Sequence, residues 1–217
     1  MKLLIIGEDY WHPIEVFQRG LKWLAEEGHE LDFVIDAKDC LTVDMLNDYD
    51  AIFVCKSNTL TAGNRSVWFE DDVTAVMPKD FADYIENGGA FIALHAGLGF
   101  TPERRPDMAD IIGTNFTGHP PQCTIEMQKI SDHPIMEGVN NFLFRDEHYR
   151  VECVVDDAII LFNTVSESAG TQVGGLIRER GKGRVAVMSP GHNAAVLMNP
   201  EYKKMIRNAL LWCTKQL

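Results

Sequence analysis

The sequence predicts an α/β fold built on a mostly parallel sheet. Apolar runs of strand length at residues 2–6, 51–55 and 90–94 are each followed by glycine, charged or histidine residues, as is typical of buried parallel strands. Segments with helical spacing alternate with these runs, and that order implies right-handed crossovers between parallel strands. With 217 residues, 46% of them hydrophobic, the chain can bury one core, so we expect a single domain over residues 1–217.

The first half of the chain alternates strands with helices. Each expected helix has apolar residues on one side, and the helix that starts at Pro13 has Gly28 just past its end, which are common start and stop signals. The expected strands are 2–6, 31–35, 51–55 and 90–94, and the expected helices are 13–27, 43–47 and 78–87.

Residues 56–77 are polar and lack a clear periodicity. A loop of this length inside a compact domain is usually a lid or a partner contact. We therefore expect Trp68 and Phe69 to be exposed there and available for a dimer contact. On this basis we also expect a homo-oligomer.

The second half has a different character, with alternating patterns and hairpin signals. A short helix at 108–112 leads into a loop at 113–121, and a glycine turn at 181–183 joins two strands. The remaining expected elements are strands at 122–130, 142–151, 159–163, 173–177 and 184–189, a turn with a short helix at 132–138, and a closing helix at 202–212.

Polar residues recur at the ends of the predicted strands. His12, His95 and His192 each follow such an end, so in a parallel sheet all three lie at one edge, where ligands bind in open α/β folds. His119 precedes two prolines and therefore lies on a loop. The acidic pair Asp146-Glu147 can fold back toward these histidines. Imidazole with carboxylate is a ligand set for zinc, manganese, iron or nickel, so we expect a divalent metal ion.

Charge and cysteine content narrow the function classes. A formal net charge of −12 argues against nucleic acid and anionic membrane surfaces as partners, and favours a small-molecule substrate. The five cysteines are odd in number and widely spaced, which is typical of reduced core residues rather than of a disulfide framework. The apolar start of the chain is too short for a signal peptide, so we expect a cytoplasmic enzyme.

A series of short motifs, in this order along nearly the whole chain, resembles the ThuA-like (trehalose utilisation) family. The motifs are Gly88-Gly89, Leu94-His95-Ala96, Gly118-His119-Pro120, His133-Pro134-Ile135 with Gly138, Asp146-Glu147-His148-Tyr149, Gly191-His192-Asn193 and Asn208-Ala209-Leu210-Leu211-Trp212. The resemblance implies a class I glutamine amidotransferase-like fold: a flavodoxin-like, doubly wound sheet with helices on both faces, plus an antiparallel extension.

The same resemblance indicates which chemistry is missing. In the amidotransferases a cysteine nucleophile occupies the turn after the central strand, whereas this chain has His95 there and no cysteine nearby. Glutaminase chemistry is therefore not expected. His192 stands about where the histidine of the amidotransferase triad would stand, which suggests that the pocket was kept and its chemistry replaced.

The resemblance implies a role in sugar metabolism. The expected substrate is a disaccharide or glycoside that a partner sugar dehydrogenase has oxidised to the 3-keto form. A ketone at C3 makes the C2 proton acidic, so a metal ion acting as Lewis acid and a base would eliminate the group at C1, after which water adds. The expected metal ligands are His95, His119 and Glu147; the catalytic candidates are Glu147, His95 and His192; the candidates for binding the sugar are Asp146, Tyr149 and His12.

Other interpretations stay open from the residues alone. The chain is also compatible with a non-catalytic carbohydrate-binding or assembly protein that keeps a degenerate pocket, and with an amidase that uses Cys55 or Cys123. His12 fits the start of a helix as well as a site, and Asp146-Glu147 fits a solvated edge. His148 is expected on the face opposite Glu147, because neighbouring residues of a strand point to opposite sides.

Overall fold

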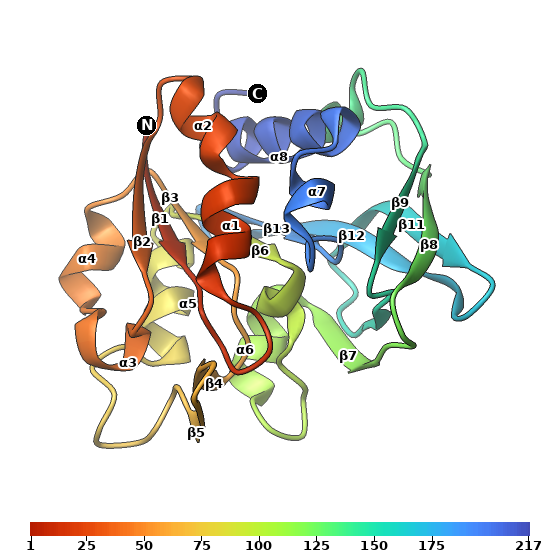
Figure 1. The fold of residues 1–217 in the computed structure, drawn as a ribbon. Coiled ribbons are helices and arrows are strands. Elements are labelled where there is room, and N and C mark those ends of the chain that lie inside the picture. Colours follow the sequence, from red (N-terminus) through yellow and green to blue (C-terminus); the bar gives the residue numbers. More distant parts are fainter.

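The computed structural model describes all 217 residues, and a nine-stranded sheet dominates it. Its strands are β1 (Lys2–Ile6), β2 (Glu30–Val34), β3 (Ala51–Val54), β6 (Ala90–Leu94), β8 (Cys123–Lys129), β9 (Phe142–Asp146), β11 (Ile159–Ser166), β12 (Gly170–Arg180) and β13 (Gly183–Met188). They lie in the order β2-β1-β3-β6-β13-β12-β11-β8-β9. Pairing is parallel from β2 to β13 and antiparallel from β13 to β9, so the antiparallel part extends one end of the sheet (Figure 1).

The parallel part has the flavodoxin-like order. Numbered along the chain, its strands lie as 2-1-3-4-5, and the order reverses beside β1. Ligands of such sheets bind beyond the carboxyl ends of the strands at this reversal. The predicted fold class is therefore confirmed.

Helices cover both faces of the sheet (Figure 1). One face carries α1 (Ile14–Gly20), α2 (Lys22–Glu26), α7 (Ala194–Leu197) and α8 (Pro200–Cys213). The other carries α3 (Ala37–Cys40), α4 (Val43–Asn47), α5 (Pro78–Glu86) and α6 (Pro106–Ile112). None of these helices combines the length and the apolar character that a membrane crossing requires.

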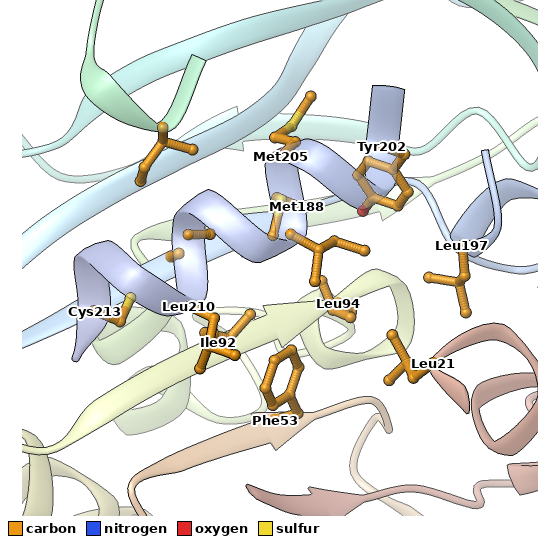
Figure 2. Close-up of a cluster of buried hydrophobic side chains, with 14 of the residues drawn as sticks. Leu21, Phe53, Ile92, Leu94, Met188, Leu197, Tyr202, Met205, Leu210 and Cys213 are labelled. Atoms are coloured by element: carbon orange, nitrogen blue, oxygen red, sulfur yellow. The ribbon is translucent and has the colours of Figure 1, made fainter. Parts of the chain in front are cut away.

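The central strand β6 shows how the two cores form. Ile92 and Leu94 point into the core under α8, while Phe91 points into the opposite core, as the twofold alternation of a strand requires. Figure 2 shows Tyr202 and Leu210 of α8 over this strand. All five side chains are fully buried. The sheet therefore lies between two apolar layers. Polar side chains can gather only where its strands end.

Two predicted elements are divided in the structure. The helix expected over residues 13–27 is two short helices, because Leu21 leaves helical geometry at φ −104°, ψ 0°; Gly20, a weak helix former, packs there against Leu197 of α7. The strand expected over 142–151 is also two, β9 and β10 (Arg150–Cys153). β10 leaves the main sheet and pairs with β7 (Thr114–Gly118), which occupies most of the segment expected to be a loop.

The expectation for residues 56–77 was wrong in two respects: part of the segment is not a loop, and its two aromatic residues are not exposed. Part of this segment is a hairpin of β4 (Thr59–Thr61) and β5 (Asn64–Val67). Trp68 is fully buried and Phe69 is 2% exposed. Their rings stack on each other with centroids 4.1 Å apart, and both pack edge to face against Phe81 of α5. They complete the core on that face, so they are not available for a dimer contact.

Candidate metal centre

Three histidines meet at the carboxyl ends of the parallel strands. His12 follows β1 after a short loop, His95 comes directly after β6, and His192 follows β13. The ring centroid of His12 is 5.0 Å from that of His95 and 5.3 Å from that of His192, and the last two are 5.3 Å apart. The expectation that these side chains share one edge of the sheet is confirmed.

Glu147 brings a carboxylate to the same point. It lies in the break between β9 and β10, and its Oε2 is 3.2 Å from Nδ1 of His192 and 3.5 Å from Nε2 of His95. One ligand atom from each of His12, His95, Glu147 and His192 lies within 4.8 Å of the others. We call these four residues the His/Glu cluster.

His95 occupies a strained turn. Its φ is +45°, an uncommon value for a residue with a side chain, and strain of this kind is typical of functional sites. The residue is fully buried and opens a 3₁₀ turn, His95–Leu98. A Cβ on Gly97 would lie 2.1 Å from the carbonyl oxygen of Val54, so only glycine lets this turn pack against β3. The turn fixes the imidazole over the sheet edge.

The hydrogen bonds of His95 leave one ring nitrogen facing the cluster. Nδ1 is 2.9 Å from the carbonyl oxygen of Ser189, which can only accept, so Nδ1 carries the proton. Nε2 then directs a lone pair toward the Glu147 carboxylate, and it is buried without a hydrogen-bond partner, as is Nδ1 of His192. Burial lowers the pKa of His95 and so favours this neutral form. A lone pair facing a carboxylate is stable when a cation lies between them.

Asp9 orients His12, and the sequence analysis missed it. The buried Asp9 carboxylate accepts from Nδ1 of His12 at 2.8 Å and from the backbone N–H groups of Trp11 and Ser57 at 2.8 and 2.7 Å. Burial alone would raise the pKa of Asp9, but the hydrogen bond from His12 and those from the backbone outweigh it and lower the pKa to about 2. A histidine that binds a metal ion with one ring nitrogen usually donates the N–H of the other to a carboxylate or carbonyl, which fixes the tautomer and orientation of the ring. The available signal was an acid three residues before His12, in the loop that follows β1.

Asp146 and Tyr149 support the cluster in different ways. The buried Asp146 accepts from the backbone N–H groups of Gly191 and His192 at 2.7 and 3.2 Å, so it holds the loop that carries His192. The ring of Tyr149 stacks on His95 with centroids 4.2 Å apart, and its hydroxyl is 3.3 Å from Nε2 of His12. Asp146 and Tyr149, which were predicted to bind sugar together with His12, therefore both contact the residues of the cluster, and Tyr149 also lines the cavity described below.

His119 lies beside the His/Glu cluster rather than within it. It follows β7, and its Nε2 is 3.5 Å from Oε2 of Glu147. Nδ1 donates to the carbonyl oxygen of Pro120 at 2.9 Å, which leaves the lone pair on Nε2. The side chain is 33% exposed. His148, as expected, points elsewhere, and its ring nitrogens are bound by Thr164 and Ser166.

Three residues of the cluster lie in the wall of a large cavity of about 1120 Å³. His12, His192 and Glu147 line it together with His119 and Tyr149. Most of the other lining residues come from the β4–β5 hairpin, from the segment 99–105 and from β7. The full set is Trp11, Ser57, Asn58, Thr59, Arg65, Val67, Ala96, Gly99, Phe100, Thr101, Glu103, Arg104, Arg105, Phe116, Thr117 and Gly118. Hydroxyl, amide and guanidinium groups among aromatic rings suit a polyhydroxylated ligand.

The cysteines lie outside this arrangement. All five are free, and none lines the cavity. Cys55, at the end of β3, is fully buried, and burial raises its pKa well above the ordinary value, so its reactive thiolate form is suppressed.

A comparison with models of protein families assigns this chain to one family. The model described as "ThuA: Trehalose utilisation" matches residues 2–213. The chain belongs to the ThuA family. A comparison with curated proteins finds no match.

Solved structures share the ThuA-family fold at low sequence identity. A ThuA-like protein from Bacteroides uniformis has a TM-score of 0.71 at 16% identity, with 98% of this chain and 91% of that chain covered. A protein described as a cytoplasmic protein from Salmonella typhimurium has a TM-score of 0.69 at 17% identity, with 98% and 99% covered. A β-galactosidase from Rahnella sp. R3 has a TM-score of 0.66 at 12% identity, and the match covers 98% of this chain but 31% of that one.

Proposed function

We propose that this ThuA-family chain is a metal-dependent enzyme that cleaves a disaccharide or glycoside oxidised to the 3-keto form. The observation that carries the proposal is the His/Glu cluster, in which Nε2 of His95 and Nδ1 of His192 are buried without hydrogen-bond partners beside a large cavity that His12, Glu147 and His192 line. The trehalose utilisation family supports a sugar as substrate. A sugar dehydrogenase that supplies the ketone and a cytoplasmic location are part of the same proposal.

The donor set fits a divalent transition metal. Three imidazoles and one carboxylate within 4.8 Å suit zinc, manganese, iron or nickel. Asp9 on His12 and the Ser189 carbonyl on His95 fix both rings with the far nitrogen directed inward. A bound ion would supply positive charge that stabilises the negative charge developing on the ketone oxygen.

We assign the role of base to His119 and the stabilisation of its charged form to Glu147. His119 was expected among the metal ligands, but its lone pair on Nε2 and its partial exposure suit a base that takes the C2 proton. Glu147 is the carboxylate beside this imidazole, with its Oε2 3.5 Å from Nε2 of His119. Its carboxylate stabilises the imidazolium that forms on His119.

The test is metal content and turnover in protein purified without a histidine tag. Wild-type protein should hold one divalent ion per chain and release the aglycone from a 3-keto glycoside. His95→Ala should lose both, whereas His119→Gln should keep the metal and lose roughly 100-fold or more in kcat, the usual contribution of a positioned base. His29→Ala, which changes a histidine outside the cluster, is the matched control.

Two outcomes would reject the proposal. Metal-free protein that binds disaccharide with unchanged affinity after His95→Ala would be a carbohydrate-binding protein without this chemistry. Loss of activity on alkylation of the native thiols would instead favour the amidase interpretation, in which Cys55 or Cys123 is the nucleophile.

A further inference from the structure

One tryptophan differs from the other three. Trp11 is 56% exposed, while Trp23, Trp68 and Trp212 are buried, none being more than 6% exposed. Trp11 also lines the cavity, directly before the cluster residue His12 in the chain. The exposure of an indole to water in a cavity wall is unfavourable, because apolar surface stays hydrated. A ligand that covers the ring would remove this cost.

The indole is held in place by contacts on several sides. Its backbone N–H donates to Asp9, the same carboxylate that fixes His12. The Arg65 guanidinium lies over the ring, 4.9 Å from its centroid, and the Tyr10 ring packs edge to face at 4.5 Å. Because Asp9 binds the backbone of Trp11 and the ring of His12, it fixes the chain that carries the indole relative to the cluster histidine. A platform that is ordered before binding adds affinity at little entropic cost.

The cavity has room for more than one sugar ring. Its volume of about 1120 Å³ lies at or above the range of roughly 300–1,000 Å³ typical of pockets for drug-sized ligands. His12 is 7% exposed and belongs to the cluster, whereas Trp11 is mostly exposed at the adjoining wall. Since Trp11 and three residues of the cluster line the same cavity, a ligand with one ring at the cluster has a wall of the cavity with an exposed indole for a second ring.

We propose that Trp11 is the platform of a second sugar subsite, which stacks the leaving ring of a disaccharide while the oxidised ring lies at the His/Glu cluster. This inference rests on the proposed function for the identity of the first ring. The carbon-bound hydrogens on one side of a pyranose pack against the exposed part of the indole, and the Arg65 guanidinium, which lies over the same ring, donates to the sugar hydroxyls. The preferred substrates are then disaccharides rather than glucosides with a small aglycone.

Tryptophan fluorescence tests the proposal directly, because Trp11 is the exposed emitter. The probes are trehalose, maltose and cellobiose, with glucose and methyl glucoside as one-ring comparisons. We expect at least one disaccharide to shift the emission and to bind about tenfold more tightly than glucose, a typical contribution of one stacked aromatic ring. Trp11→Ala should lose that advantage and Trp11→Phe should keep most of it, while Trp23→Phe should keep the full response.

The proposal is overturned if Trp11→Ala binds the disaccharides as wild type does, if glucose binds as tightly as every disaccharide, or if no sugar in the panel changes the emission of Trp11. Metal content separates this result from a failure of the proposed function. A disaccharide response in protein that holds no metal would reject the metal chemistry and keep the subsite. Metal-dependent turnover that is indifferent to Trp11→Ala would reject the subsite alone.

Discussion

Replacing Asp9 by asparagine tests whether the support of His12 matters as the structure indicates. The Asp9 carboxylate is fully buried and accepts from the His12 ring and from backbone N–H groups of Trp11, His12 and Ser57. An amide has one accepting oxygen where the carboxylate has two, and its NH₂ group would face donors. Asp9→Asn therefore removes both the charge and some of the hydrogen bonds.

The size of the effect follows from the pKa of Asp9. A value of about 2 in place of 3.8 corresponds to about 2 kcal/mol of stability from the ionised carboxylate. Because the pKa in the folded protein is lowered, this stability is present above about pH 4 and is lost as the pH falls through 2. We expect Asp9→Asn to lower the free energy of unfolding at pH 7 by about 2 kcal/mol, and to weaken metal binding roughly 10- to 100-fold, as loss of such a support usually does.

The assay is urea unfolding of chelator-treated protein, followed by titration with Zn²⁺. Asp71→Asn, at an exposed position, is the control for loss of one negative charge. A variant that unfolds at the wild-type urea concentration and binds Zn²⁺ with wild-type affinity would refute the role given to Asp9.

Further predictions concern the packing around the site and two buried groups. Gly191→Ala should destabilise the protein by about 1–3 kcal/mol, because Gly191 has φ +142° and a Cβ there would lie 3.1 Å from that of His95; Gly28→Ala, at φ +91° in open space, measures the conformational cost alone in the same urea experiment. Burial lowers the pKa of Lys56 to about 8 from 10.5, so its charge costs stability below pH 8. That cost disappears toward pH 10.5. Lys56→Met removes this cost together with the hydrogen bond to the Thr59 carbonyl and the contact with the Trp68 ring, so its stability relative to wild type should fall as the pH rises from 8 to 10.5; a constant difference would contradict this. Turnover should survive iodoacetamide treatment of the native protein, with Cys55 unmodified in the mass spectrum, because that thiol is buried.

The sequence predicted the parallel half of the fold and the meeting of its histidines for a simple physical reason. Buried parallel strands are continuous apolar runs, so the end of each run locates the edge of the sheet, and His12, His95 and His192 follow such ends. Glu147 was predicted as a ligand, but its placement depends on the break between β9 and β10, where the alternating pattern continues across the gap.

The features that the sequence did not predict depend on contacts between residues that are distant in the sequence. Trp68 and Phe69 are buried by Phe81, which is distant in sequence, although their own segment is polar. Residues 114–118 form a strand only because β10 leaves the main sheet to pair with them. Asp9 is marked in the sequence only as an acid three residues before His12, and its role follows from the hydrogen bonds that converge on it.

Anomalous diffraction from crystals of untagged protein, collected at the absorption edges of zinc, manganese, iron and nickel, tests the central claim most directly. We predict one strong peak between Nε2 of His95, Glu147 and the facing nitrogens of His12 and His192, at roughly 2.0–2.2 Å from its ligands. Its occupancy should fall to background in His95→Ala. Direct hydrogen bonds between Glu147 and these imidazoles, with no peak at any of the edges after growth in metal-supplemented medium, would contradict the account.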